Sequence, residues 1–348
     1  MIIFIVLFIL LIFYKSKFKR KGIFDDFLSK NRTDSIKGIF IVVVFISHIS
    51  EYYNVSGTDL TAWYDYSFFL PAKALGQLSV VMFLFYSGYG IKESINLKGN
   101  KYINSIPNRR ILNTLVNFDI AVFIYCIVLN KDYSIGTIIS SLLGWDSVGN
   151  SNWYIFDIII LYFFTYIAYR INSKHSILII GLLISLFIML LSIYKGTWWY
   201  NTLYAYWAGI CFSEYKNVLI TKTKKNFLYT TLFIIAGALI SLCIYLIFYD
   251  QFKNDKEFIG GIVFNMMSVS FAFIVVIFTM KVSIQNRCLI FIGKNLFPIY
   301  IYQRLPMITL SNIYPFLVTD YPPIYLLLCI IITVTISLLY KYFSLNIL

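Results

Sequence analysis

The sequence predicts an all-α integral membrane protein, a polytopic bundle of about 11 transmembrane helices. Only 13% of its 348 residues are charged, whereas a soluble domain carries about a quarter. Hydrophobic residues make up 59% of the chain, and the mean hydropathy is +0.77. Apolar runs long enough to cross a bilayer follow one another along the sequence. Water is therefore not the main solvent of this protein.

The expected spans are apolar runs, most of them about 17 to 25 residues long, that end at charged or turn-forming residues. They are 2–14, 36–53, 76–91, 111–129, 153–171, 176–194, 198–214, 227–249, 258–281, 288–305 and 323–343. The first run is short, and a basic segment follows it instead of preceding it, which is the reverse of a signal peptide. We expect residues 1–30 to form a retained anchor helix with a basic connector, and residues 31–348 to form the multi-pass core.

Basic residues alternate between the predicted connectors. Twenty of the 29 lysines and arginines lie in every second connector, and only five lie in the connectors between these. The basic connectors are 15–35, 92–110, 170–175, 215–226 and 281–287. Because cytoplasmic loops carry an excess of Lys and Arg, this pattern predicts that they face the cytoplasm, with the N-terminus outside and the C-terminus inside. The net charge of +13 thus reflects topology in a cell membrane and not nucleic-acid binding.

Cysteines and histidines limit the possible chemistry. The five cysteines stand singly inside apolar segments, with no CxxC or Cys/His spacing. The only histidines are His48 and His175. This pattern argues against a disulfide framework and a metal site, so any histidine chemistry must come from one of these two residues.

Lys37 and His48 belong to one predicted helix. They are eleven residues apart, which on an α-helix corresponds to a rise of about 16 Å and a rotation of about 20°, so both project from the same face. His48 lies well inside the span, where an ionisable side chain is costly and indicates function. A histidine that is hydrogen-bonded between helices for packing alone is the other interpretation.

Two further segments lie at membrane boundaries. The third span ends in Ser87-Gly88-Tyr89-Gly90, where glycines permit the close approach of a helix or a ligand. The pair Arg109 and Arg110 precedes the fourth span. Arginine forks suit phosphate groups, although anchoring at the cytoplasmic surface accounts for them equally.

The fifth and tenth spans also carry unusual residues. Trp153 and Tyr154 begin the fifth span at the interface, and Asp157 lies one turn deeper, where an acid needs a partner or a proton. In the tenth span, Pro298 permits a kinked or broken helix, which in membranes usually borders a cavity. Tyr300 and Gln303 follow this proline.

Taken in order, these motifs resemble the membrane acyltransferase-3 family of bacterial integral-membrane O-acyltransferases. A basic residue, ten intervening residues and a histidine open that family's core, as Lys37 and His48 do here, although the family usually has arginine at the first position. The later matching segments are 85–89, 109–110, 153–154 and 293–300. Gln303 stands where the last motif often ends in histidine. The resemblance begins near residue 30 and implies a ten-helix acyltransferase core, to which the first span is an addition.

The resemblance implies transfer of an acetyl or other short acyl group from acyl-CoA, commonly acetyl-CoA, to a carbohydrate hydroxyl. The acceptor would be a cell-surface or capsular polysaccharide or its lipid-linked precursor. Lys37, Arg109 and Arg110 are expected to bind the donor, and the substrate-binding residues are expected to be Ser87, Trp153, Tyr154, Tyr300 and Gln303. The expected catalytic residues are His48, which matches the family's histidine, and Asp157, which would orient the imidazole or supply its counter-charge. His48 is expected either to act as a general base or to carry the acyl group itself.

Two other functions fit the composition. A transporter or flippase of lipid-linked sugars also has ionisable residues and kinked helices within the membrane, but it predicts inverted halves, and no matching pair of interrupted segments is present. A polysaccharide polymerase predicts a large basic outer loop, whereas the predicted outer loops are short. The sequence leaves the oligomeric state open.

Overall fold

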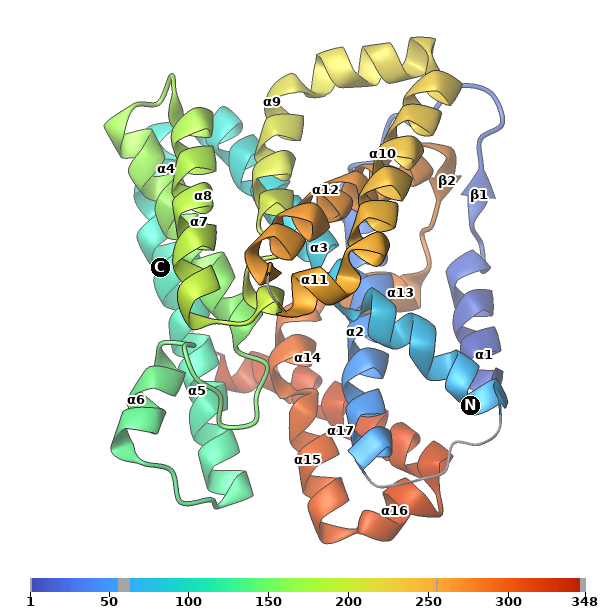
Figure 1. Cartoon of the computed structure of the whole chain (residues 1–348), viewed down its shortest axis with the longest axis vertical. Coiled ribbons are helices and arrows are strands. Elements are labelled where there is room, and N and C mark those ends of the chain that lie inside the picture. Colours follow the sequence, from blue (N-terminus) through green and yellow to red (C-terminus); the bar gives the residue numbers. More distant parts are fainter. Residues whose placement is uncertain (1, 56–62, 255, 345–348) are drawn as a thin grey trace.

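The computed structural model describes residues 2–55, 63–254 and 256–344, most of which are helical (Figure 1). In chain order the helices are α1 (Ile2–Phe13), α2 (Lys30–Val55), α3 (Trp63–Lys98), α4 (Asn100–Ile106), the π-helix η1 (Pro107–Leu112), α5 (Asn113–Leu129), α6 (Ile135–Leu142), α7 (Trp153–Ile171), α8 (Ser176–Tyr194), the 3-10 helix η2 (Thr197–Trp199), α9 (Tyr204–Lys225), α10 (Phe227–Ile247), α11 (Tyr249–Asn254), α12 (Glu257–Lys281), α13 (Arg287–Lys294), α14 (Leu296–Tyr302), α15 (Arg304–Ile313), α16 (Pro315–Thr319) and α17 (Pro322–Phe343). Two short strands, β1 (Lys17–Phe18) and β2 (Val282–Ser283), pair antiparallel.

Seven helical segments within the described ranges are long and apolar enough to cross a membrane. They are Lys30–Tyr53, Asn100–Leu129, Trp153–Ile171, Ser176–Tyr194, Phe227–Ile247, Glu257–Lys281 and Pro322–Tyr340. This finding confirms a multi-pass, all-α membrane protein. The predicted count of 11 spans is not confirmed.

The four other predicted spans take different forms. The first is α1, whose 12 residues correspond to a helix of about 18 Å, shorter than a hydrocarbon core of about 30 Å. The run 76–91 lies inside the 36-residue α3, and the run 198–214 begins in η2 and continues into α9. The run 288–305 is divided among α13, α14 and the start of α15.

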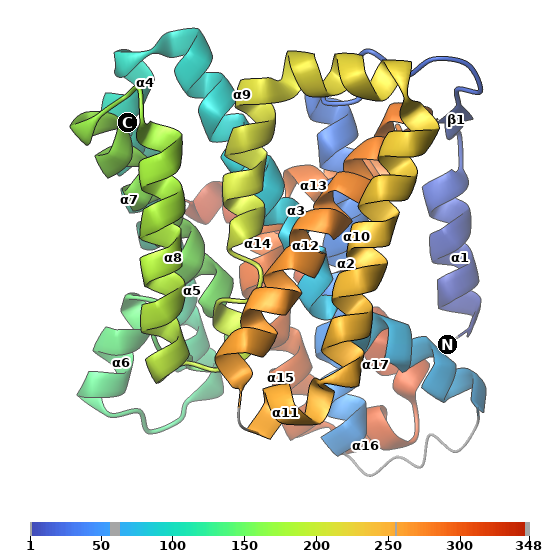
Figure 2. The same cartoon turned by 45° about the horizontal axis from the view of Figure 1, so that its top comes forward.

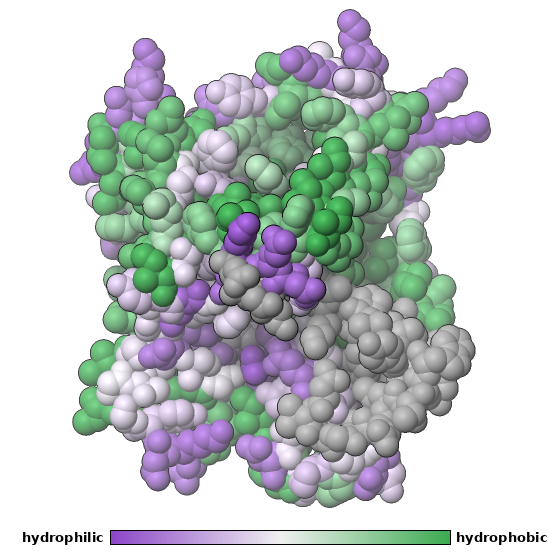
Figure 3. All heavy atoms as spheres, viewed as in Figure 1, coloured by the Kyte–Doolittle hydropathy of each residue, from purple (hydrophilic) through white to green (hydrophobic). Residues whose placement is uncertain are grey.

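The five basic connectors meet at one end of the molecule, here called the basic end (top of Figures 1 and 2). The connector 15–35 pairs with 281–287 through β1 and β2, and Lys224 forms an ion pair with Asp25 at 3.1 Å. Arg170 donates to Asn104 at 3.3 Å, which joins two further connectors. Hydrophilic side chains project from this edge above a largely hydrophobic band (Figure 3). The α5–α6 turn, α11 and α16 lie at the other end, here called the opposite end (Figure 2).

The assignment of the basic end to the cytoplasm is a testable prediction. A cysteine at Asp132 is expected to react with a membrane-impermeant maleimide in intact cells, whereas one at Lys222 reacts only after permeabilisation. Both positions are exposed, at the opposite end and the basic end respectively. The unsubstituted chain, which has five cysteines, gives the background labelling. Equal labelling of both positions in intact cells would contradict the topology.

Glycines let the central helices touch backbone to backbone. A methyl group at Gly88 of α3 would overlap the carbonyl oxygen of Tyr206 in α9. A methyl group at Gly209 of α9 would likewise overlap the carbonyl oxygen of Phe85. Gly88 therefore serves helix packing, the first of the two uses expected from the sequence.

The same device joins α2 to α13. A methyl group at Gly38 would overlap the carbonyl oxygen of Leu289, and one at Gly293 would overlap that of Asp34. These contacts fix the broken helix α13–α15 against α2. As a result, residues of α14 and α15 are brought beside the half of α2 that contains His48.

Candidate functional site

A cavity of about 400 Å³ lies in the half of the bundle nearer the opposite end. It is formed by α2, α3, the loop before α7, η2, α14 and α15. Its lining residues are Val44, Ser47, His48, Glu51, Gly76, Gln77, Val80, Ser147, Asn150, Ser151, Asn152, Trp153, Trp198, Tyr300 and Arg304. Three residues selected from the sequence, His48, Trp153 and Tyr300, are therefore brought together.

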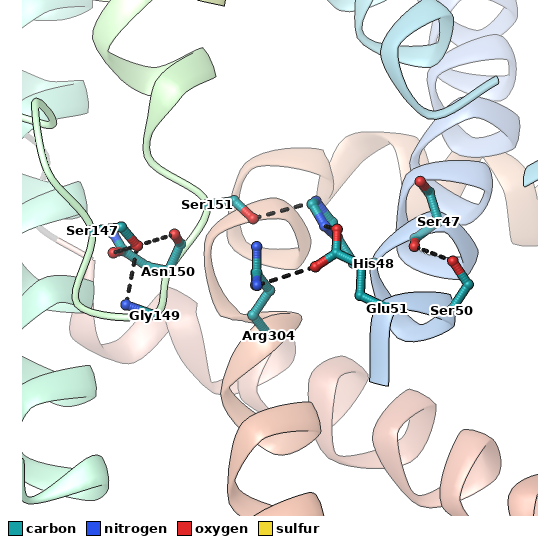
Figure 4. Close-up of polar contacts among 9 residues, drawn as sticks. All are labelled: Ser47, His48, Ser50, Glu51, Ser147, Gly149, Asn150, Ser151 and Arg304. Atoms are coloured by element: carbon teal, nitrogen blue, oxygen red, sulfur yellow. Dashed lines mark hydrogen bonds and ion pairs between the residues drawn. The ribbon is translucent and has the colours of Figure 1, made fainter. Parts of the chain in front are cut away.

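His48 projects from α2 into this cavity (Figure 4). Its Nε2 lies 3.4 Å from Ser151 Oγ, and its Nδ1 lies 3.6 Å from an oxygen of Glu51, one turn further along the helix. Only 16% of the side chain is exposed. One ring nitrogen thus faces the loop before α7, and the other faces a carboxylate.

Glu51 connects His48 to a cation. Its second carboxylate oxygen lies 3.3 Å from Nη2 of Arg304, at the start of α15 (Figure 4). A carboxylate next to an imidazole favours the protonated ring and orients it. Glu51 thus lies between the imidazole of His48 and the guanidinium of Arg304 and contacts both.

Asp157, the acid expected to assist His48, lies elsewhere. It is fully buried in α7, and within the described part of the chain neither carboxylate oxygen has a hydrogen-bond partner. It does not line the cavity. Glu51 therefore occupies the place beside the imidazole for which Asp157 was considered, because it follows His48 by one turn of the same helix.

Aromatic rings form the wall behind the cavity. Trp153 and Tyr300 line it, and Tyr154 packs edge-on against Tyr300 with 5.2 Å between ring centroids. Ser87 interacts with Tyr154 and does not line the cavity. The structure thus places Tyr154 and Ser87 one layer behind the residues that reach the cavity.

The broken helix predicted from Pro298 borders the cavity. Pro298 lies in the first turn of α14, where its lack of an N–H costs no helical hydrogen bond, and the breaks fall at Asn295 and Gln303. Gln303 is fully buried and donates to the carbonyl oxygen of Tyr300 at 3.3 Å. Gln303 does not line the cavity. It lies at the break between α14 and α15, and this break positions Tyr300 and Arg304, which do line it.

The loop 144–152 is folded by its own side chains. Ser147 donates to the carbonyl oxygen of Asn150 at 2.6 Å, and Asn152 donates to that of Gly144 at 2.8 Å. These bonds hold the intervening Ser151 toward His48.

Lys195, which directly follows α8, anchors the loop 144–152. Its ammonium donates to the carbonyl oxygen of Trp145 at 2.7 Å and lies 3.9 Å and 4.5 Å from the ring centroids of Trp145 and Trp199. Cation–π contacts of this kind are strongest where water is excluded. Burial lowers the pKa of Lys195, while the neighbouring carboxylate of Asp146 acts to raise it. The loop is thereby fixed to η2, which supplies Trp198 to the cavity.

A second cluster forms at the basic end of α2. Lys37 lies 3.4 Å from a carboxylate oxygen of Asp34, and the like charge of Arg110 repels its ammonium. Arg110 lies in the π-helix η1, donates to the hydroxyl of Tyr102 at 3.0 Å and packs over the ring of Tyr162. π-Helical turns are frequent at functional sites. Lys37 and Arg110 together form a cationic site at this end.

Arg109 is more exposed than Arg110. It lines a surface depression with Lys98, Lys101 and Tyr102, the tyrosine to which Arg110 donates. The two arginines thus differ in their surroundings, since Arg109 is exposed whereas Arg110 is half-buried against Tyr102 and Tyr162.

A family model described as an acyltransferase domain matches residues 31–342, nearly the whole chain. The chain belongs to the acyltransferase-3 family. A search of curated proteins and a search of solved structures each found no match. Together with the membrane-spanning helices, the match identifies a multi-pass membrane acyltransferase.

The cavity contains an imidazole with a carboxylate and a guanidinium beside it. An imidazole with a near-neutral intrinsic pKa is suited to take a proton from a hydroxyl, and the adjoining carboxylate stabilises the imidazolium that forms. Glu51 is 54% exposed at its side chain, so its charge is partly screened, and Arg304 limits its motion. A carboxylate beside the imidazole and a guanidinium beside the carboxylate are an arrangement that general acid–base chemistry can use.

Sequence reasoning missed three residues of this arrangement. Glu51 could have been found from its i,i+3 spacing to His48, which places both on one helix face. Arg304 closes the polar segment around Pro298, and Ser151 lies in the polar stretch directly before Trp153. Neither position alone indicates a contact with His48, because the contacts depend on how distant helices pack.

Proposed function

We propose that this acyltransferase moves an acetyl or other short acyl group from acyl-CoA to a hydroxyl of a cell-surface or capsular polysaccharide or of its lipid-linked precursor. One observation carries the proposal. The single helix α2 presents Lys37 in a cationic cluster at the basic end and His48 in a cavity toward the opposite end. Their separation of eleven positions corresponds to about 16 Å along the helix.

The cationic cluster supports an acyl-CoA donor. Arg110 and Lys37 can form charge-assisted hydrogen bonds with phosphate oxygens. The basic end is the predicted cytoplasmic side, where acyl-CoA is available. With its phosphates held there, a donor can extend its long pantetheine arm between the helices toward His48.

The His48 cavity supports a sugar acceptor. Its lining mixes aromatic rings with neutral polar groups such as Gln77, Asn150 and Ser151, which suit the apolar faces and hydroxyls of a carbohydrate. His48 takes the proton of the acceptor hydroxyl while the sugar oxygen attacks the thioester carbonyl. The tetrahedral intermediate then collapses, the carbon–sulfur bond breaks, and the imidazolium returns its proton to the leaving thiolate. Glu51 stabilises the imidazolium between these steps.

The same residues also permit a two-step route. The imidazole attacks the thioester first, CoA leaves as its thiol, and the acyl-imidazole then passes its acyl group to the sugar hydroxyl. A rapid quench of the protein with labelled acyl-CoA and no acceptor separates the two routes. Label is retained on the protein only in the second.

A donor assay tests the proposal. Purified protein in detergent is incubated with acetyl-CoA labelled in its acetyl group and with surface glycans or glycolipids extracted from the source cells. We expect base-labile label on a glycan fraction, as an ester gives. If no fraction is labelled while reconstituted protein moves lipid-linked sugars across a bilayer, the transporter interpretation replaces this one.

A further inference from the structure

A second cavity lies beside the first at the opposite end. Its volume is about 210 Å³, and residues of η2, α10, α11 and α12 form it. Consecutive residues of η2 separate the two spaces, since Trp198 lines the His48 cavity and Thr197 lines the second one. A polymer that occupies the first cavity can therefore reach the second across η2.

Aromatic rings make up much of the second cavity. The ring of Tyr245 packs against those of Tyr249, Phe252 and Phe264, with centroids 6.0, 6.0 and 5.6 Å away. All four rings line the cavity. Such rings offer flat apolar surfaces on which the C–H face of a sugar can stack.

Hydrogen-bond acceptors complete the lining. Asn201 is only 6% exposed, and its Oδ1 has no hydrogen-bond partner within the described part of the chain. A buried polar atom without a partner costs about 1–3 kcal/mol, so it needs a donor from outside the protein. The Glu257 carboxylate also lines the cavity and accepts from the N–H and the hydroxyl of Thr197 at 3.0 and 3.2 Å.

We infer that the second cavity is a sugar-binding subsite, which holds a neighbouring unit of the same glycan chain whose hydroxyl is acylated at His48. This inference rests on the proposed function for the identity of the glycan. Stacking surfaces next to acceptor oxygens match a ring with an apolar face and hydroxyl donors. The negative charge of Glu257 favours a neutral or amino sugar over a uronic acid at this unit.

The test compares a short and a long acceptor. Tyr249→Ala removes an exposed ring, so folding is not at risk, and Asn201→Ala removes the unpaired acceptor. Each variant is expected to raise KM for the polymer about tenfold, with kcat unchanged and with KM for a single-sugar acceptor unchanged. Tyr229→Ala is the matched control, because Tyr229 is an exposed tyrosine near the start of α10, far along the helix from the cavity.

A binding measurement makes the result independent of catalysis. Fluorescently labelled polymer is titrated with protein that carries His48→Ala, with and without Tyr249→Ala, in the absence of acyl-CoA. We expect the second substitution to weaken binding by the same factor of about ten. Unchanged KM and unchanged binding in both subsite variants, with normal acylation by the wild type, would overturn the subsite and leave the proposed function standing. Absence of glycan acylation and binding by the wild-type protein would overturn both.

Discussion

His48→Ala is expected to lower glycan acylation by about 10²- to 10⁴-fold, because it removes the group that takes the proton from the acceptor hydroxyl. His48 lines the cavity and contacts Ser151, and its neighbour Glu51 is positioned to stabilise the imidazolium. The variant should still insert and fold, since the imidazole has few contacts on which helix packing depends. Turnover is measured with labelled acyl-CoA and quantified protein.

The second histidine provides the control for general damage. His175 is exposed in the connector before α8 at the basic end, far along the bundle from the cavity. His175→Ala is expected to keep near wild-type turnover. If His48→Ala kept more than about half of the wild-type turnover, the catalytic role of His48 would be refuted.

Arg110→Gln is expected to raise KM for acyl-CoA by at least about tenfold, because a hydrogen bond to a charged group contributes about 1.5–3 kcal/mol. Arg110 is half-buried at the basic end, where Tyr102 and Tyr162 hold it. The measurement is the dependence of initial rate on acyl-CoA concentration at saturating acceptor. A thermal unfolding curve in detergent checks that the loss of the tyrosine contacts has not unfolded the variant.

Arg109→Gln is the matched control, one residue away. Because Arg109 is exposed and its charge is screened by solvent, its replacement should change KM for acyl-CoA by less than about twofold. A larger effect at Arg109 than at Arg110 would move the donor site to the outer surface. Equal small effects would return both residues to the role of topology anchors.

The arrangement of the two ends could be predicted from the sequence, whereas the number of spans could not. The positive-inside rule applies to each loop separately, so the five basic connectors lie at one end of the molecule, as expected. Span counting assumes one continuous helix for each apolar run. The run 288–305 breaks this assumption at Asn295 and Gln303, and α1 is too short to cross by itself.

The candidate site was predictable along helices but not between them. Lys37 and His48 share α2, so their relation follows from helical geometry alone. The acid that lies beside His48 could not be predicted from how deeply each acid lies in the membrane. Asp157 is the more deeply buried acid, yet Glu51 is the one beside the ring, because helix rotation decides which acid faces it. Arg304 joins the site only through the packing of α15 on α2.

The central claim is that α2 links a donor site at the cytoplasmic end to an acceptor cavity that opens to the other side. Proteoliposomes sorted for one orientation test it, with labelled acetyl-CoA supplied only on the side of the basic end and membrane-impermeant glycan only on the opposite side. We predict that label reaches the glycan across the intact bilayer and that His48→Ala abolishes it. Labelling that requires donor and acceptor on the same side would contradict the account.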